Sequence, residues 1–259
     1  MKKSELSAIV NNFPGNWPRM RRWSYNLPMP FEIQPTLRGY RINQNGCVLS
    51  EILKQPGATN SVFDVLAAAT AVMAPGPEVA MLGFAGGGMV APLRKAGSEA
   101  CVRAVDLARQ GYDLFAKVSS GWCGAVEFEE GDAVEWLRNQ SRPFDVLIED
   151  LSVPVSGDVE KPAVCWTVLP PLIRSRIRPD GIVISNMLRS AGMSWPVFAP
   201  LFAEGHRRAL MVHLKEFENR ILIAGNFEQS AVWVSRRLKA CLQTIGSDQS
   251  EAFHISTLG

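Results

Sequence analysis

Short apolar runs alternate with amphipathic stretches along most of the chain after residue 78. This alternation is typical of βαβ units in a parallel, doubly wound sheet. It predicts core strands at 79–84, 100–105, 125–129, 146–149 and 181–186. Helices are expected in the amphipathic stretches, at 88–96, 108–117, 132–139, 160–177 and 194–204. The pattern therefore indicates an α/β fold with a Rossmann-like core.

The pattern changes toward the C-terminal end of the chain. Two strand-like runs, 208–216 and 220–224, are joined by only three residues, which are too few for a crossover helix. These runs are therefore expected to pair antiparallel, whereas a standard dinucleotide-binding sheet continues with βα crossovers. We predict a seven-stranded, mostly parallel sheet with a terminal antiparallel hairpin, followed by an amphipathic helix at about 228–245.

A separate β-hairpin is predicted before the core. Asn45-Gly46 suits the positive φ angles of a type I′ turn and is flanked by strand-like runs at 39–43 and 47–52. A helix at about 60–74 follows and ends before Pro75-Gly76-Pro77. The sequence thus predicts a small β region ahead of the first core strand.

Residues 1–36 hold five of the 17 prolines and show little periodicity, so we expect an extended arm. Basic and aromatic residues gather in it, namely Lys2, Lys3, Trp17, Arg19, Arg21, Arg22 and Trp23. Two interpretations stay open: an exposed arm, or a basic aromatic patch that touches RNA, a membrane or a sister subunit. We expect two parts in the chain, an arm with the hairpin at 1–56 and a nucleoside-binding core with its C-terminal helix at 57–259.

Charge and composition exclude several classes of protein. The 259 residues carry a formal net charge of only +2, which is too weak a field for a dedicated nucleic-acid-binding protein. No stretch approaches the roughly 18 apolar residues that span a bilayer, and the first residues lack an apolar leader region. We therefore expect a cytoplasmic protein with no membrane partner.

The sulfur and imidazole side chains are scattered. Neither a C-x-x-C pair nor two histidines at i, i+4 spacing occurs among Cys47, Cys101, Cys123, Cys165, Cys241, His206, His213 and His254. This spacing favours reduced core thiols over a disulfide framework, and it predicts no bound metal.

The first βα turn of the core is rich in small residues, with Gly83, Ala85, Gly86, Gly87 and Gly88 in a row broken only by Phe84. Glycines let the backbone approach a ligand closely, and the following helix offers unpaired N–H groups. The run Gly86-x-Gly88-x-x-Ala91 also satisfies the loose dinucleotide fingerprint. The alternative is a tight turn that needs small residues only for packing.

Acidic residues follow three of the predicted strands. Asp106, with Leu107 after it, ends the second strand 18 residues beyond Gly88, where a carboxylate can accept hydrogen bonds from ribose hydroxyls. Asp132 and Ala133 follow the third strand, near an expected adenine ring, although a helix N-cap is an alternative for Asp132. Asp106 has the same alternative.

Glu149 and Asp150 end the buried run of the fourth strand. Adjacent side chains of a strand alternate in direction, so only one of these carboxylates can face a ligand at the carboxyl edge of the sheet. We predict that Asp150 faces the ligand and acts as general base or electrostatic anchor. The alternative is a solvated carboxylate at a strand end.

Together these motifs resemble the spermidine synthases, the aminopropyltransferases that share the class I methyltransferase fold. That family has a GGGDGG turn, an acidic strand end, a GDG or GDA turn and a strand end of the form F/Y-D-V-I-I-x-D-x-x-D-P. The corresponding segments here are Gly83–Gly88, Asp106, Gly131-Asp132-Ala133 and the run 144–154, F-D-V-L-I-E-D-L-S-V-P. The resemblance implies roles for Asp106 at the ribose, Asp132 at the adenine and Asp150 at the attacking amine.

The departures from the family affect the amine half of the site. Gly86 stands where the family has the Asp that holds the aminopropyl or methionine tail, and Val153 stands where it has an Asp that helps to bind the diamine. A dicationic diamine needs several carboxylates to replace its water. We therefore expect poor binding of putrescine and an intact nucleoside half.

Three hypotheses follow from this sequence. The first is a transferase that uses S-adenosylmethionine or decarboxylated S-adenosylmethionine as co-substrate and alkylates a small-molecule acceptor, in a chain that forms a homodimer. The second is a non-catalytic binding or dimerisation module descended from such an enzyme. The third is an NAD(P)-dependent oxidoreductase, which the antiparallel end of the sheet argues against.

Overall fold

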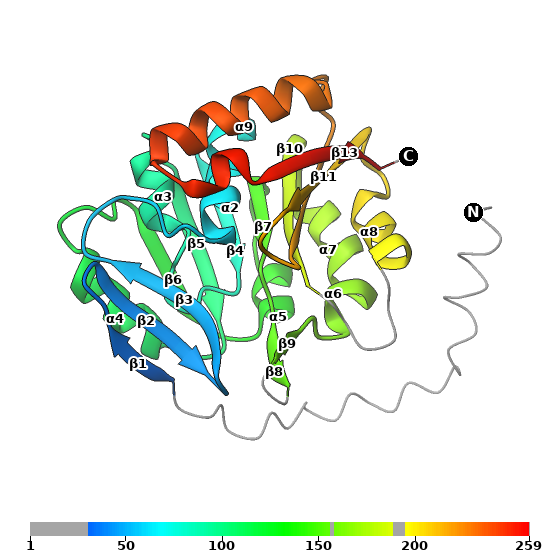
Figure 1. The fold of residues 1–259 in the computed structure, drawn as a ribbon. Coiled ribbons are helices and arrows are strands. Elements are labelled where there is room, and N and C mark those ends of the chain that lie inside the picture. The colour runs from blue at the N-terminus through cyan, green and yellow to red at the C-terminus, as the bar shows by residue number, and fades with distance from the viewer. Residues whose placement is uncertain (1–30, 156–157, 189–194, 259) are drawn as a thin grey trace. The chain divides into compact units, whose positions relative to one another are not determined.

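The computed structural model describes residues 31–155, 158–188 and 195–258 (Figure 1). Of the arm predicted at residues 1–36, residues 1–30 lie outside the described residues. The expected division of the chain at residue 57 stays a prediction.

The core is an eight-stranded sheet with the strand order β13-β11-β12-β10-β7-β4-β5-β6. The five strands predicted from the apolar runs are present and run parallel to their neighbours among them. Their bounds are β4 (Glu78–Leu82), β5 (Cys101–Asp106), β6 (Val126–Glu130), β7 (Phe144–Glu149) and β10 (Ile177–Met187). All six residues of β7 are buried, which explains its uninterrupted apolar run.

The sheet closes antiparallel, as predicted. β12 (Arg220–Gly225) lies between β10 and β11 (Arg208–Leu214) and pairs antiparallel with both. A sheet that continued with βα crossovers, as in standard dinucleotide-binding domains, would have a parallel strand in that place. The predicted α/β fold class, with its doubly wound sheet and terminal hairpin, is confirmed.

An eighth strand, β13 (Phe253–Thr257), lies beyond the seven that the sequence predicts, and it pairs antiparallel with β11. It is an edge strand with three exposed residues, and His254 and Ser256 interrupt its apolar positions. An edge strand needs no continuous apolar run, because one side of it faces solvent. This is why the hydrophobic pattern did not indicate it.

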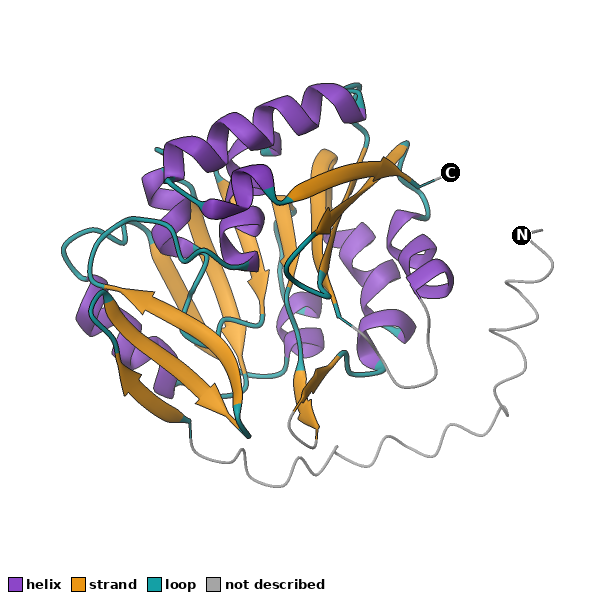
Figure 2. Cartoon of the chain, in the orientation of Figure 1, coloured by secondary structure: helices purple, strands orange, loops and turns teal. Residues whose placement is uncertain are grey.

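Helices cover both faces of the sheet (Figure 2). One face packs against α2 (Val62–Met73), α3 (Val90–Lys95), α4 (Gln110–Ser119) and α9 (Ala231–Ile245). The other packs against α5 (Ala133–Arg138), α6 (Val164–Thr167), α7 (Leu169–Arg176) and α8 (Trp195–Ala203). A short 3₁₀ helix, η1 (Asp248–Glu251), connects α9 to β13.

Capping residues explain where the two longest helices begin. Ser61 accepts a hydrogen bond from Phe63 N at the start of α2, and Ser230 accepts one from Trp233 N at the start of α9. α9 ends at Gly246, whose φ of 81° is the left-handed conformation of a helix C-cap. None of the helices in the described ranges is long and apolar enough to cross a membrane.

The segment predicted as one helix at 160–177 is divided. Residues 158–160 form β9 (Asp158–Glu160), which pairs with β8 (Val153–Val155) in a small antiparallel ribbon. The helical part breaks at Val168, between α6 and α7, because Pro170 and Pro171 cannot continue the backbone hydrogen bonds of α6. β10 then begins at Ile177, four residues before its predicted start.

The predicted hairpin is part of a three-stranded antiparallel sheet, β1-β2-β3. β2 (Gly39–Gln44) and β3 (Cys47–Leu53) pair as expected around Asn45 and Gly46, whose φ angles are 51° and 80°. The additional strand, β1 (Glu32–Pro35), falls in the stretch predicted as part of the arm. All four of its residues are exposed, so its pattern gave no apolar signal.

Candidate functional site

The glycine-rich turn follows β4 and lies against the carboxyl end of β7. Asp150 N donates to Leu82 O at 2.9 Å, and a Cβ added to Gly83 would lie 2.6 Å from Asp150 O. Gly83 also has a φ of +87°, so both the contact and the conformation require glycine there. The turn therefore brings the end of β4 into contact with the backbone of Asp150, the predicted general base.

Asp106 lies on the other side of the turn and holds it in place. Its Oδ2 accepts hydrogen bonds from Phe84 N at 2.7 Å and Ala85 N at 2.6 Å, and its Oδ1 accepts one from Leu107 N at 2.7 Å. A carboxylate has about four acceptor positions. Asp106 is partly exposed, so acceptor capacity remains for a ligand hydroxyl.

The inner glycines of the turn are buried under side chains. A Cβ on Gly87 would lie 2.4 Å from the Phe84 ring, and a Cβ on Gly88 would lie 2.8 Å from the Phe63 ring. Gly88 N donates to the buried Ser50 Oγ at 3.0 Å. Close packing thus accounts for these glycines, whereas Gly83 and Ala85 stay partly exposed at the edge of the sheet.

Asp132 forms the helix N-cap that the sequence left open as an alternative. Its Oδ1 accepts hydrogen bonds from Val134 N at 2.9 Å and Glu135 N at 3.0 Å, at the start of α5. Ala133 is buried, and Leu107 is 47% exposed. The adenine role of Asp132 and the nucleoside contacts of Leu107 and Ala133 stay predictions.

The carboxyl group of Asp150 ends a series of side-chain hydrogen bonds that the sequence did not indicate. Asn186 Nδ2 donates to Asp150 Oδ1 at 2.7 Å, and Asn219 Nδ2 donates to Asn186 Oδ1 at 2.9 Å. Burial raises the pKa of Asp150 to about 7, while the Lys161 ammonium and the Asn186 hydrogen bond partly oppose this rise. A carboxyl with this pKa exchanges a proton near neutral pH.

Glu149 points to the opposite face of the sheet from Asp150, as strand alternation requires. It is fully buried and forms an ion pair with Lys161, whose Nζ lies 2.6 Å from Oε1 and 2.7 Å from Oε2. Cys165 Sγ and Ser185 Oγ also donate to its carboxylate. The neighbouring Glu149 carboxylate raises the pKa of Lys161 despite its burial, so the ammonium stays charged.

The site residues predicted from the sequence do not include Asn186, Asn219 or Lys161. Asn186 closes the predicted strand at 181–186, and polar residues at a strand's carboxyl end could have identified it. Lys161 was counted within a helix at 160–177. No local pattern distinguishes a buried lysine from a solvated one, because its partner is twelve residues away.

The region that corresponds to the family's amine half is apolar. A Cβ on Gly86 would lie 2.7 Å from Ile42 Cδ1 and 3.0 Å from Ile52 Cγ1, and both isoleucines are buried. Val153 lies in the β8–β9 ribbon, opposite Glu160. The three-stranded sheet therefore closes the space that an aspartate at position 86 would occupy.

Gly86→Asp is expected to lower the free energy of unfolding by about 1–3 kcal/mol, because the new side chain overpacks the isoleucines and buries a carboxylate. Urea titration of the purified variant measures this loss. Gly121→Asp is the matched control, since nothing lies within 4 Å of a Cβ at Gly121. A Gly86→Asp variant with unchanged stability and new diamine binding would show that this space is open.

The described part of the chain shows no group of three His, Cys, Asp or Glu side chains placed to hold a metal ion. The candidate site accordingly consists of the turn backbone, Asp106 and Asp150 at the carboxyl ends of β4, β5 and β7. Its charged groups are carboxylates, which suit hydroxyl and ammonium groups of a ligand.

No protein-family model and no curated protein matches the chain. Solved structures do. A probable spermidine synthase from Corynebacterium glutamicum superposes with a TM-score of 0.64 at 18% sequence identity, over 86% of each chain. A spermidine synthase in complex with the transition state analogue AdoDATO gives a TM-score of 0.58 at 12% identity, over 85% of this chain and 75% of that one.

Human methyltransferase-like protein 13, in complex with SAH, gives a TM-score of 0.56 at 16% identity, over 71% of this chain and 90% of that one. These identities are low, so the likeness concerns the fold. The eight-stranded sheet with β12 inserted antiparallel supports the same assignment. The chain has the class I methyltransferase-like fold that spermidine synthases share.

Proposed function

We propose that the chain is a transferase that binds S-adenosylmethionine or its decarboxylated form and alkylates a small acceptor. The observation that carries this proposal is the arrangement of two aspartates around one glycine turn. The carboxylate of Asp106 holds the turn from the end of β5, and the backbone of Asp150 lies against it at the end of β7. Ligands of open α/β sheets bind at these strand ends.

The nucleoside would lie along the edge of the sheet, with its ribose hydroxyls donating to Asp106. The neighbours solved with AdoDATO and SAH support an adenosyl ligand for this fold. S-adenosylmethionine and decarboxylated S-adenosylmethionine differ in the tail on the sulfonium, which the turn and Asp150 would contact. The tail decides whether a methyl or an aminopropyl group is transferred.

The transfer needs little covalent help from the protein. The acceptor's lone pair attacks the carbon beside the sulfonium, the carbon–sulfur bond breaks, and its electron pair stays on the thioether that leaves. The proton of the acceptor passes to Asp150. A general base works best when its pKa lies near the working pH, and the pKa of Asp150 is about 7.

The acceptor would be less charged than a diamine. Ile42 and Ile52 occupy the space beside Gly86, and Val153 replaces an acidic residue of the family. Leaving an ammonium group desolvated and unpaired costs several kcal/mol. We therefore propose a neutral or singly charged nucleophile in the acceptor site and keep the homodimer as a prediction.

One observation favours a second candidate, a binding module without turnover. Five backbone N–H groups of the turn already donate within the chain, those of Gly83, Phe84, Ala85, Gly87 and Gly88. A turn whose N–H groups are already hydrogen-bonded offers a ligand fewer donors than a turn whose N–H groups are unpaired. Such a module would bind the nucleoside and release no thioether product.

A thermal-shift screen tests the proposal. A ligand that binds only the folded state raises its stability by about 2.7 kcal/mol at a concentration of 100 times Kd. We expect stabilisation by sulfonium nucleosides and by their thioether products, and none by NADH or NADPH. Stabilisation by a nicotinamide cofactor alone would favour the oxidoreductase hypothesis and contradict this proposal.

A further inference from the structure

A hollow with charged lining residues lies at the amino-terminal ends of the core strands, whereas Asp106 and Asp150 lie at their carboxyl ends. Its volume is about 160 Å³, and it is lined by Glu78, Arg103, Arg142, Pro143, Phe144 and Arg178. Glu78 and Phe144 begin β4 and β7, which run parallel. Since a strand rises about 3.3 Å per residue, the length of β4 separates this hollow from the glycine turn.

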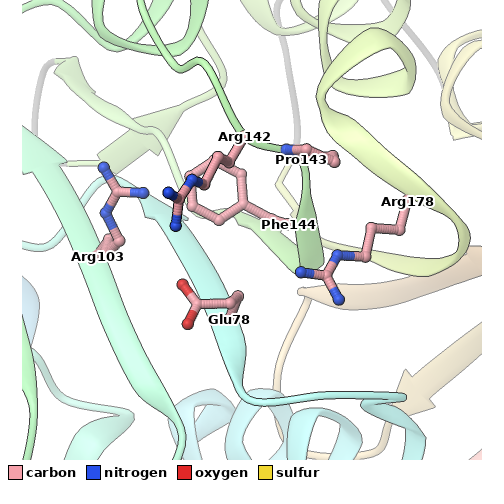
Figure 3. A pocket seen from close by; sticks show the side chains of 6 residues that line it. All are labelled: Glu78, Arg103, Arg142, Pro143, Phe144 and Arg178. Carbon is pink, nitrogen blue, oxygen red and sulfur yellow. The ribbon is translucent and has the colours of Figure 1, made fainter.

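Three arginines, Arg103, Arg142 and Arg178, line the hollow together with Phe144 (Figure 3). Arg103 lies over the ring at 5.3 Å from its centroid and donates to Gln140 Oε1 at 2.8 Å. Its Nε also forms an ion pair with Glu127 Oε2 at 3.4 Å. Arg178 lies 3.0 Å from Asp145 Oδ1. These contacts hold two of the arginines in place and leave part of each guanidinium group unused.

Arg142 is exposed and forms no hydrogen bond or ion pair with any residue in the described ranges. Glu78 lines the same hollow, yet its carboxylate forms no ion pair within 4.0 Å with these three arginines, all of which are described. Arg103 and Arg178 each have a carboxylate partner outside the lining, Glu127 and Asp145, whereas Arg142 has none among the described residues. The six lining residues themselves carry three positive charges and one negative charge, so N–H donors exceed acceptors in the hollow.

The chemistry of these donors selects the class of ligand. A guanidinium group presents a planar fork of N–H donors that matches phosphate and carboxylate oxygens. Three of them suit a dianion better than a single carboxylate. The hollow is also smaller than the roughly 300–1,000 Å³ of pockets for drug-sized ligands, which favours a compact ion.

We propose that this hollow is a binding site for a phosphate-class dianion, held by Arg103, Arg142 and Arg178. The anion is either inorganic or the phosphate group of a small phosphomonoester. The site is independent of the proposed nucleoside site, because the two share no residue. Its anion would supply the partner that Arg142 lacks among the described residues, and it would connect the amino-terminal ends of β5, β7 and β10.

Isothermal titration calorimetry on the full chain tests this proposal, with pyrophosphate, inorganic phosphate, glycerol 3-phosphate and succinate at matched ionic strength. We expect one-to-one binding of a phosphate compound and weaker binding of succinate. Arg142→Gln is expected to weaken binding of the phosphate compound at least about tenfold in Kd, which corresponds to about 1.4 kcal/mol. Glycerol 3-phosphate and inorganic phosphate then distinguish the two sources of the anion.

Two further variants make the outcome decisive. Glu78→Gln removes the negative charge from the lining, so it is expected to tighten phosphate binding, opposite in sign to Arg142→Gln. Arg236→Gln on α9 is the matched control, since this exposed arginine also forms no hydrogen bond or ion pair with described residues, and it should leave affinity unchanged. Equal affinity in Arg142→Gln and the wild type, or equal weakening by Arg236→Gln, would overturn the proposal.

Discussion

Replacing Lys161 with alanine is expected to lower the free energy of unfolding by about 3–5 kcal/mol. The Lys161 ammonium is buried and lies 2.6 Å and 2.7 Å from the two oxygens of the fully buried Glu149. Without it, a carboxylate is left in the core with only Cys165, Ser185 and Leu151 N as donors. Chemical denaturation of the purified variant measures the loss.

Two further variants separate the ion pair from a general loss of packing. The double variant Lys161→Met with Glu149→Gln removes both charges, so it should lose less stability than the sum of the two single variants. Lys239→Ala removes an exposed ion pair with Glu251 at 2.7 Å and should cost less than about 1 kcal/mol. If Lys161→Ala and Lys239→Ala lower the free energy of unfolding equally, the buried Lys161–Glu149 pair contributes no more to stability than an exposed pair.

Asp150→Asn is expected to reduce the rate of alkyl transfer about 10²–10⁴-fold, the usual contribution of a general base. Asparagine keeps the shape of the side chain and the acceptor for Asn186 Nδ2 but cannot take a proton. Because the base acts when ionised, the wild-type rate should rise with pH through about 7 and then level off. Release of the thioether product over a pH series measures this effect.

Asp150→Asn should also raise the stability of the folded chain above pH 7, although it lowers the rate of transfer. The pKa of Asp150 is about 7 in the folded chain and 3.8 in a model peptide, so the folded state binds this proton more tightly. Wild-type stability should therefore fall as the pH rises from about 4 to 7, by on the order of a few kcal/mol. Asp150→Asn should flatten this fall and be more stable than the wild type at pH 8. Identical pH profiles of stability would contradict the raised pKa.

The core strands were predictable because parallel strands buried on both faces leave continuous apolar runs, as the six buried residues of β7 show. The antiparallel end was predictable from the short connection between β11 and β12. Edge strands were not, because β1 and β13 are largely exposed and carry little apolar signal. The β8–β9 ribbon lies almost wholly before the helix predicted at 160–177, in a stretch for which no strand was predicted, and only Glu160 falls within that helix.

For the candidate site, the sequence located the residues that lie at strand ends, and the structure places Asp106 and Asp150 on the two sides of the turn. What the sequence could not give is each carboxylate's partner. Asp106 uses three acceptor positions within the chain, and Asn186 reaches Asp150 from a strand 36 residues away. Such contacts depend on the tertiary fold, and a local pattern contains no information on them.

The central claim is that Asp106 binds the ribose of an adenosyl ligand at the carboxyl edge of the sheet. Calorimetric titration with S-adenosylmethionine and with decarboxylated S-adenosylmethionine tests it most directly, in the wild type, in Asp106→Asn and in the control Asp113→Asn on the exposed surface of α4. The claim predicts one-to-one binding of at least one sulfonium, at least about tenfold weaker in Asp106→Asn and unchanged in the control. No heat with either sulfonium, or equal affinity in all three proteins, would contradict it.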